Sequence, residues 1–204
     1  MEKYKLWALP CLLRDFASTP DSAIIKNMAD AFLKPEESIE AWDVRPGDKV
    51  ADFGCGAGFF SIPLGQRVGP TGRVYALDIR PEALEATRAK VKLFHLFNIE
   101  PTRADLERER GSGLKNESVD KVLIANILFQ AENKDVIVRE AYRILRLGGT
   151  LMVIEWEDGK VTAGPAADGR IHKDGAKHLF QNAGFSFYKE FHAGSHHYGL
   201  IFKK

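Results

Sequence analysis

Short apolar runs alternate with longer amphipathic segments over most of this chain of 204 residues. The short runs have the length of β-strands, and the longer segments repeat their apolar positions with the spacing of a helix. We expect strands at 50–53, 73–78, 100–105, 119–125 and 150–156, and helices at 59–68, 81–97, 133–146 and 173–183. Strands that alternate with helices in this way predict a parallel sheet with right-handed crossovers.

The end of the chain departs from this alternation. Two further strand-like runs, at 185–192 and 196–203, are separated only by Ala193-Gly194-Ser195, which is the spacing of a hairpin. The last strand must therefore run antiparallel to its predecessor. We expect a Rossmann-like α/β fold with a seven-stranded, mostly parallel sheet and an antiparallel C-terminal hairpin strand.

The first 45 residues show no comparable succession of strands and helices. Two short helices, broken at Pro35, are spaced to share an apolar face made of Met28, Phe32, Ile39 and Trp42. We expect a helical N-terminal extension over 1–45, which serves either as a lid over a ligand or as plain packing. One domain then follows over 46–204.

Composition narrows the class of protein. The apolar share of 45% and the charged share of 28% are ordinary for a globular domain. Lys and Arg total 29 against 28 Asp and Glu, so the basic excess typical of nucleic-acid or membrane-surface binding is missing. No apolar run reaches the roughly 18 residues of a membrane span. We expect a cytoplasmic protein without a membrane partner; a nucleic-acid partner is disfavoured, and the oligomeric state stays open.

The two cysteines, Cys11 and Cys55, do not form a CxxC pair. Their number and spacing argue against a disulfide framework and against a structural zinc site. Such sparse cysteine usage is typical of a reducing cytosol. We expect no bound metal.

A glycine-rich turn follows the first strand and carries the strongest chemical signal. It reads Asp52-Phe53-Gly54-Cys55-Gly56-Ala57-Gly58. Glycines at such a turn let a ligand approach the backbone closely. Nicotinamide enzymes use GxGxxG at this place, whereas this turn reads GxGxG and Phe59 stands at the third glycine position. A bulky side chain there would obstruct a pyrophosphate, so a nicotinamide oxidoreductase is disfavoured.

Two further carboxylates end the next two strands. Asp78 lies 20 residues beyond Gly58, a place from which a carboxylate accepts both hydroxyls of a ribose. Asp105, after Ala104, ends the third strand and suits an adenine amino group. Asp also caps loops of this kind without any ligand, and that alternative stays open for Asp105.

Between about Asp48 and Trp156 the chain resembles the class I S-adenosylmethionine-dependent methyltransferases. It is most similar to the small-molecule branch that includes the ubiquinone/menaquinone C-methyltransferases. Four segments match this family in order: Val50–Ser61 its first motif, Val74–Ile79 its acidic second strand, Val119–Asn126 its fourth-strand motif, and Leu145–Ile154 its "L-x-P-G-G-x-L" segment. In the last segment Leu147 replaces the usual proline.

The resemblance implies S-adenosylmethionine as the cofactor, with S-adenosylhomocysteine as its product. Gly54 and Gly56 would lie against the methionine part, and Cys55 between them would be a small filler. Asp52 would help to hold the methionine amino group, directly or through water. Asn126 would face the methyl-donor end.

The resemblance also implies where the nucleoside part lies. Asp78 would bind the ribose, and Ile79 would pack on one face of the adenine. Asp105 would receive the adenine amino group, with the backbone of Ala104 beside it.

In this family the final antiparallel strand lies between the fifth and the sixth. A group of polar residues should then gather near Glu155 and Trp156 on the acceptor side: His192, Ser195, His196 and His197. Neutral imidazole is the commonest side-chain base near pH 7, so His196 and His197 are candidate catalytic residues. Solvated histidines on a polar turn are the alternative.

The function expected from the resemblance is methyl transfer from the sulfonium to a small-molecule acceptor. Alignment of donor and acceptor would supply most of the rate, and a base is needed only where the acceptor must lose a proton. Two alternatives stay open. One is an RNA or protein methyltransferase, since Val68–Val74 resembles tRNA and protein-repair members; the other is a protein that binds S-adenosylmethionine without catalysis.

Overall fold

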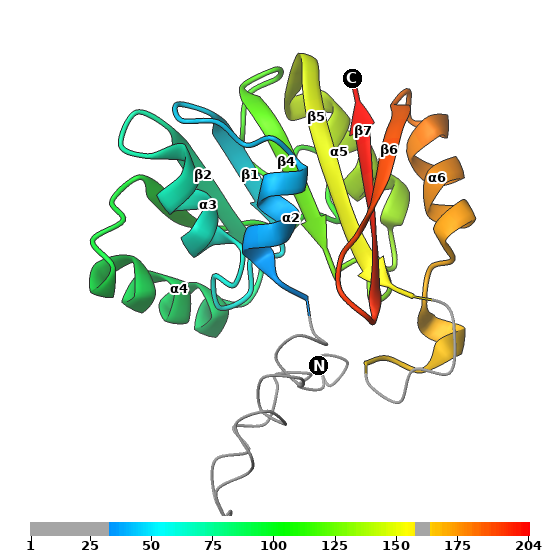
Figure 1. Ribbon diagram of the computed structural model, residues 1–204, viewed down its shortest axis with the longest axis horizontal. Coiled ribbons are helices and arrows are strands. Elements are labelled where there is room, and N and C mark those ends of the chain that lie inside the picture. Colours follow the sequence, from blue (N-terminus) through cyan, green and yellow to red (C-terminus); the bar gives the residue numbers. More distant parts are fainter. Residues whose placement is uncertain (1–32, 158–163) are drawn as a thin grey trace, which may run out of the picture.

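Seven strands form one sheet in the order β3-β2-β1-β4-β5-β7-β6 in the computed structural model, which describes residues 33–157 and 164–204 (Figure 1). The strands are β1 (Lys49–Phe53), β2 (Arg73–Asp78), β3 (Ile99–Arg103), β4 (Val119–Ala125), β5 (Leu145–Trp156), β6 (Ser186–His192) and β7 (His197–Lys203). The helices are α2 (Pro35–Ala41), α3 (Ser61–Val68), α4 (Pro81–Leu93), α5 (Lys134–Ile144) and α6 (Lys173–Asn182), with a short 3-10 turn η1 (Ala167–Gly169).

The pairing of the strands confirms the predicted architecture. β1 to β5 pair in parallel, whereas β7 pairs antiparallel with both β5 and β6. The last strand in the chain is thus inserted between the fifth and the sixth. Because parallel strands end at the same edge, β1, β2, β4 and β5 bring their carboxyl ends to one end of the molecule, and β7 begins there.

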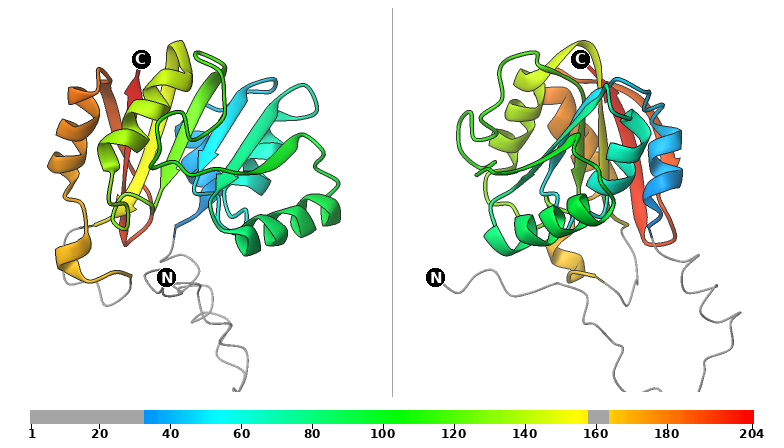
Figure 2. Two further views of the ribbon diagram at one scale, coloured as in Figure 1. Left: turned by 180° about the vertical axis from the view of Figure 1, so that it is seen from behind. Right: turned by 90° about the vertical axis from the view of Figure 1, so that its left-hand side faces the viewer.

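Helices cover both faces of the sheet, with α5 and α6 on one side and α2 and α3 on the other (Figure 2). The central strand β4 contributes to both cores. Val122 and Ile124 pack with α5 and α6, and Leu123 packs with α2 and α3. All three side chains are fully buried, which explains why this strand is apolar without alternation.

Several predicted boundaries differ from the structure, and two of the differences have a clear cause. The helix expected from Phe59 begins at Ser61, because Gly58 has a positive φ of 79° that prolongs the turn. The helix expected to reach residue 146 before a glycine cap ends at Ile144, and Leu145 already has extended backbone and belongs to β5. The ammonium of Lys204 takes the place of the expected cap, since it donates to the backbone oxygens of Tyr142 (2.8 Å) and Leu145 (2.7 Å).

Of the N-terminal extension, the structure describes α2 and its surroundings. Pro35 occupies the first turn of α2, where a missing N–H costs nothing, and Ile39 and Trp42 are buried as expected. Met28 and Phe32 lie outside the described residues, as does most of the segment expected to act as a lid. In the part of the chain that the structure describes, no helix is long and apolar enough to cross a membrane.

Candidate functional site

The glycine turn between β1 and α3 forms an open backbone surface at the carboxyl end of the sheet. Gly54 and Gly56 have φ angles of 71° and 54°, which side chains with a Cβ rarely adopt. A Cβ on Gly54 would collide with Ile127, so this glycine is needed for packing. A Cβ on Gly56 would meet only the Arg80 guanidinium, at 3.9 Å. The space beside Gly56 is therefore open to a ligand.

Asp52 lies under this turn and is almost fully buried. The hydroxyl of Ser61 donates to its Oδ2 at 2.5 Å. Burial raises the pKa of Asp52 to about 7, the Ser61 hydrogen bond opposes this rise, and the charge of Asp78 adds to it. A buried carboxylate with one hydroxyl partner and no cation among the described residues suits the ammonium of an amino acid.

Asp78 ends β2 with its side chain buried. Its Oδ2 accepts from the backbone N–H of Gly56 at 2.9 Å, and its Oδ1 accepts from that of Arg80 at 2.9 Å. The guanidinium of Arg80 also donates to both oxygens at 3.2 Å. A ribose at Asp78 would therefore displace this half-exposed guanidinium. Arg80 was not among the residues predicted from the sequence, although its position two residues after Asp78 places it within reach.

The predicted adenine end is more open. Ile79 exposes 36% of its surface, so it offers an apolar face to a flat ring. Ala104 donates its N–H to the backbone oxygen of Asp78 at 3.0 Å, which fixes the end of β3 beside β2. Asp105 forms an ion pair with Arg108 at 2.7 Å and accepts the N–H of Glu107 at 3.3 Å. Asp105 thus caps its own loop here, which is the alternative left open by the sequence.

Cys55 is buried inside the glycine turn. Its thiol lies 3.6 Å from the backbone oxygen of Gly56, and burial raises its pKa above the ordinary value, with the charges of Asp52 and Asp78 adding to the rise. A thiol with a raised pKa carries little thiolate and is a poor nucleophile. Its geometry fits the expected role of a small filler.

At the carboxyl end of β4, Asn126 contacts the first residue of β7. Asn126 has a positive φ of 55°, and its Nδ2 lies 3.1 Å from Nε2 of His197. The His197 ring stacks on Trp156 with centroids 4.3 Å apart. Burial, together with the charges of His196 and Arg170, lowers the pKa of His197 to about 4. His197 is therefore a neutral imidazole at neutral pH.

Glu155 completes this group from β5. It is fully buried, and its Oε1 accepts the backbone N–H groups of Ile127 (3.1 Å) and Leu128 (2.8 Å). Burial raises the pKa of Glu155 to about 8, although these two hydrogen bonds oppose the rise. The side chain is thus mostly protonated near neutral pH, and it holds the turn that follows Asn126.

Several buried polar atoms in this group lack a hydrogen-bond partner. They are Asn126 Oδ1, Glu155 Oε2, Trp156 Nε1 and His197 Nδ1. Buried polar atoms are nearly always satisfied, so four such atoms within one cluster mark a candidate ligand site. We call Asn126, Glu155, Trp156 and His197 the β4–β5–β7 cluster. The sequence placed Glu155 only as a neighbour of the histidines. Its one available signal was a carboxylate at the end of an apolar strand.

His192, His196 and His197 lie at this end of the sheet, as expected from an antiparallel last strand that begins there. His192 pairs with Tyr198 across β6 and β7, and His197 pairs with Trp156 across β5 and β7. Among them, only His197 belongs to the cluster. The ring of His196 instead contacts the Ser195 hydroxyl at 2.6 Å.

A hollow of about 280 Å³ borders His192 and His197. Among the described residues no group of side chains could hold a metal ion.

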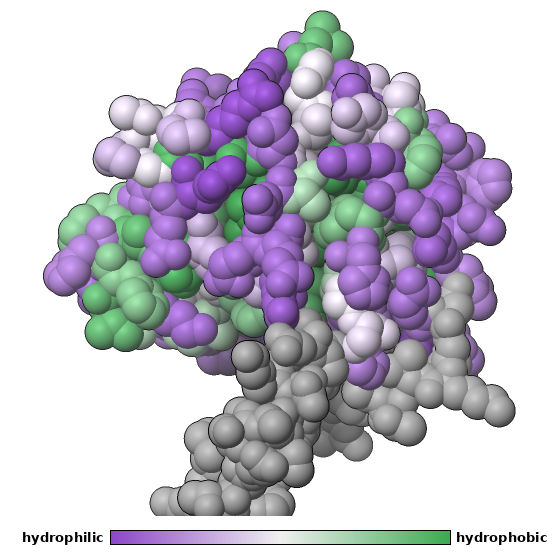
Figure 3. Space-filling model, viewed as in Figure 1, coloured by the Kyte–Doolittle hydropathy of each residue, from purple (hydrophilic) through white to green (hydrophobic). Residues whose placement is uncertain are grey.

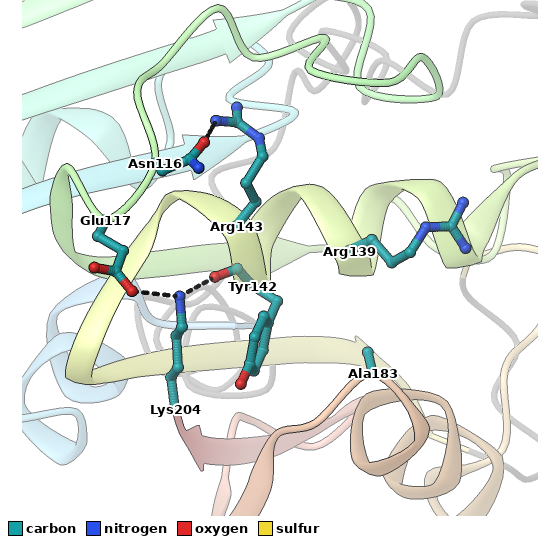
Figure 4. Close-up of a pocket in the computed structure, with 7 residues that line it drawn as sticks. All are labelled: Asn116, Glu117, Arg139, Tyr142, Arg143, Ala183 and Lys204. Carbon is teal, nitrogen blue, oxygen red and sulfur yellow. Dashed lines mark hydrogen bonds and ion pairs between the residues drawn. The ribbon is translucent and has the colours of Figure 1, made fainter.

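A larger surface depression lies at the opposite end of the sheet and is lined by basic residues (Figure 4). Its cations are already engaged by the protein. Arg143 donates to Asn116 at 2.7 Å and pairs with Glu140 at 2.7 Å, and Lys204 contacts Glu117 at 3.4 Å besides the two carbonyls of the α5 end. This depression is a structural network remote from the glycine turn.

Comparisons with known proteins agree with this geometry. A family model described as a methyltransferase domain matches residues 45–184. The chain is 34% identical over 120 residues to the ubiquinone/menaquinone biosynthesis C-methyltransferase UbiE of Haemophilus ducreyi, covering 58% of this chain and 45% of that protein. It is 28% identical over 120 residues to the demethylmenaquinone methyltransferase of a Geobacillus species, covering 59% and 50%. The matched region thus spans about half the length of these relatives.

Among solved structures, the chain is similar to a SAM-dependent methyltransferase from Aquifex aeolicus. The TM-score is 0.78 at 23% identity, and the match covers 90% of this chain and 98% of that one. At this level of identity the likeness concerns the fold.

Proposed function

This chain belongs to the methyltransferase-domain family, within the class I S-adenosylmethionine-dependent methyltransferases, and from this membership we propose that it transfers a methyl group from S-adenosylmethionine to a small-molecule acceptor. The observation that carries the proposal is the open turn at Gly56 with one buried carboxylate on each side. Asp52 lies under the turn, and Asp78 accepts its backbone N–H. One carboxylate for an ammonium and one for ribose hydroxyls, on either side of this turn, suit a methionine and a ribose joined through sulfur.

The residues present fit this cofactor. The carboxylate of Asp52 would accept hydrogen bonds from the methionine ammonium. The positive charge would return the pKa of Asp52 toward the ordinary value. Asp78 would accept the ribose hydroxyls once Arg80 turns outward, and Ile79 would cover the adenine. Asn126 would face the methyl-donor end. When bound, S-adenosylmethionine supplies a methyl group on a sulfonium, which is a good leaving group and needs no activation by the protein.

We place the acceptor beside the β4–β5–β7 cluster. The stacked rings of Trp156 and His197 offer a flat surface, and the unpartnered atoms of Asn126 and Glu155 suit oxygen substituents. The named relatives act on demethylmenaquinone and in ubiquinone/menaquinone biosynthesis. An oxygen-substituted aromatic ring is therefore the acceptor class that we propose.

His197 would be the base in this reaction. This role needs the side-chain amide of Asn126 in the flipped orientation, with Oδ1 in place of Nδ2 at Nε2 of His197. The proton then lies on Nε2, Nδ1 presents a lone pair, and Nδ2 of Asn126 is the amide atom left to contact an oxygen of the acceptor. A lone pair at this place can take a proton from a ring hydroxyl as the methyl group moves. Its lowered pKa keeps the imidazole neutral, so this lone pair is not already protonated at neutral pH.

Calorimetry with S-adenosylhomocysteine and with NAD tests the cofactor. We expect micromolar binding of the former and none of the latter. Asp78→Ala should weaken binding by roughly tenfold or more, because a charge-assisted hydrogen bond contributes about 1.5–3 kcal/mol. Tight binding of NAD alone would refute the proposal, and an unchanged affinity of Asp78→Ala would show that the ribose is held elsewhere.

Transfer of a labelled methyl group then identifies the acceptor class. The full chain is incubated with labelled S-adenosylmethionine and, separately, with hydroxylated naphthoquinols, bulk tRNA or a protein mixture. We expect label in the quinol fraction. Label in tRNA or protein would favour the alternative classes, and cofactor binding with no transfer to any of them would favour a binding protein.

A further inference from the structure

The segment that joins α4 to β3 carries a cluster of large apolar side chains on the surface. Leu93, Phe94 and Phe97 expose 70%, 50% and 75% of their surfaces. Figure 3 shows apolar surface at the left-hand edge of the molecule, where α4 ends. Single exposed apolar residues are ordinary, but three such residues within five positions form a contiguous patch, which marks an interaction site.

The backbone holds this patch in place. His95, in the middle of the segment, has a φ of 54°, which few residues other than glycine adopt. The N–H of Leu96 donates to the backbone oxygen of Val91 at 3.0 Å, and the N–H of Ile99 donates to that of Leu96 at 3.1 Å. Val91 and Ile99 are buried on either side. The exposed side chains are therefore carried by a built turn.

The charge next to the patch is positive. Lys90 and Lys92 lie in the last turn of α4, and neither forms an ion pair with any of the described residues. The nearby carboxylates are engaged, since Glu85 pairs with Arg88 and Glu100 pairs with Arg73. Apolar side chains beside unpaired lysines suit the surface of a lipid bilayer, where anionic headgroups cover apolar acyl chains.

We propose that this basic apolar patch, Lys90 to Phe97, docks the protein on an anionic lipid surface. The patch departs from the expectation of no membrane partner, which rested on net charge and on apolar run length. It lies outside the cofactor site, because α4 has 13 residues and a helix of that length separates the patch from Pro81 by about 20 Å. The proposal does not depend on methyl transfer.

Two other occupants fit less well. A second copy of the chain, packed symmetrically on this patch, would bring the lysines of both copies together. A single-stranded RNA could stack on Phe94 and Phe97, but Leu93 is aliphatic and offers no stacking face. Lipid is the partner that uses all three apolar side chains and both lysines.

Docking here would orient the rest of the molecule. α4 begins directly after β2, and Figure 1 shows it low on the sheet, toward the end at which β5 also ends. The glycine turn and the β4–β5–β7 cluster lie at that same end. The patch itself follows α4 and leads into the amino end of β3, since Ile99 pairs with Val74 at the start of β2. A lipid surface against it would therefore lie beside the edge strand β3 and leave the β4–β5–β7 cluster uncovered.

Sedimentation of the full chain with sucrose-loaded vesicles tests the proposal. Vesicles of phosphatidylglycerol and phosphatidylcholine in equal parts are compared with pure phosphatidylcholine. We expect binding to the anionic vesicles that weakens at high salt. The double variant Phe94→Ser, Phe97→Ser should bind roughly tenfold more weakly or worse, and Lys90→Gln with Lys92→Gln should lose roughly fivefold for each lysine.

Leu147→Gln is the matched control, because Leu147 exposes 69% of its surface and lies at the start of β5, four strands away from β3 in the sheet. It should leave vesicle binding unchanged. All variants should keep the melting temperature and the affinity for S-adenosylhomocysteine.

Absence of vesicle binding by the folded chain would overturn the proposal, as would an equal loss in Leu147→Gln. Concentration-dependent dimerisation that the phenylalanine variant abolishes would overturn it in favour of self-association. Binding of a labelled oligouridine that is lost in the same variant, without vesicle binding, would overturn it in favour of RNA.

Discussion

Arg80 and Asp78 illustrate what a single side chain adds to a motif. The sequence motif assigns Asp78 to a ribose, and the structure pairs the same carboxylate with a neighbouring guanidinium. A ligand at this place therefore competes with a partner that the protein already holds. The motif could not indicate this competition, because the direction of a long side chain is set by contacts and not by spacing.

Arg80→Gln should strengthen binding of S-adenosylhomocysteine by up to about fivefold, since a half-exposed ion pair contributes about 0–1 kcal/mol and 1.4 kcal/mol is tenfold. Calorimetry at low and moderate salt measures the effect, and the gain should be larger at low salt. Weaker binding in the variant would mean that the guanidinium contacts the cofactor directly.

The adjacent residues His196 and His197 have different expected roles: His197 is the proposed base, and His196 is a surface residue. His197→Gln should lower kcat by roughly 10²–10⁴-fold with cofactor affinity intact. His196→Gln should change kcat less than about threefold, because its ring lies outside the β4–β5–β7 cluster. The acid limb of the wild-type rate profile should lie near pH 4, where His197 takes up a proton. Equal losses in both variants would contradict this assignment.

At the scale of elements, the sequence predicted best where local signals are complete. The strands at 73–78 and 119–125 were predicted with the observed bounds, because each contains an apolar run flanked by polar residues, Val74–Leu77 in the first and Val122–Ala125 in the second. The end of α5 was predicted wrongly because its cap is supplied by a distant residue, Lys204, which follows β7. Glu155 was missed as a member of the site because its partners are the backbone amides of the turn after β4. Contacts between distant segments leave no local pattern.

Lys204→Met should lower the free energy of unfolding by roughly 2–3 kcal/mol, since the buried end of α5 would lose two hydrogen bonds from a charged donor. Chemical denaturation measures the change. Lys115→Met is the control, because Lys115 is exposed and its replacement should alter stability by less than about 0.5 kcal/mol. Equal stability of the two variants would show that the α5 end is satisfied without Lys204.

For the whole molecule, buried acids at the sheet edge make stability depend on pH. The pKa of Glu155 is about 8 in the folded chain against 4.5 for the ordinary group. The folded state therefore keeps a proton that the unfolded chain releases, so this residue favours folding below pH 4.5 and loses that contribution as the pH rises to 8. Asp52 acts in the same direction up to about pH 7, whereas neutral His197 favours folding as the pH rises from about 4 to 6.5.

Glu155→Gln isolates one of these effects, because the amide copies the protonated acid. The variant should match the wild type near pH 4.5 and exceed it by about 2 kcal/mol or more at pH 8. Denaturant midpoints across this range measure the difference. A constant difference at all pH values would show that Glu155 has the same pKa folded and unfolded.

The insertion of β7 between β5 and β6 also sets an order in time. The residues assigned to the cofactor lie between Asp52 and Asp105, apart from Asn126, whereas His197 leaves the ribosome about ninety residues after Asp105. At roughly 5–20 residues per second this gap lasts about 5–20 s. For the last forty or so residues of that interval, after Trp156 has emerged, the nascent sheet has an open edge at β5, with Glu155 and Trp156 beside it and no strand to pair with. The acceptor half of the site is thus built after the cofactor half.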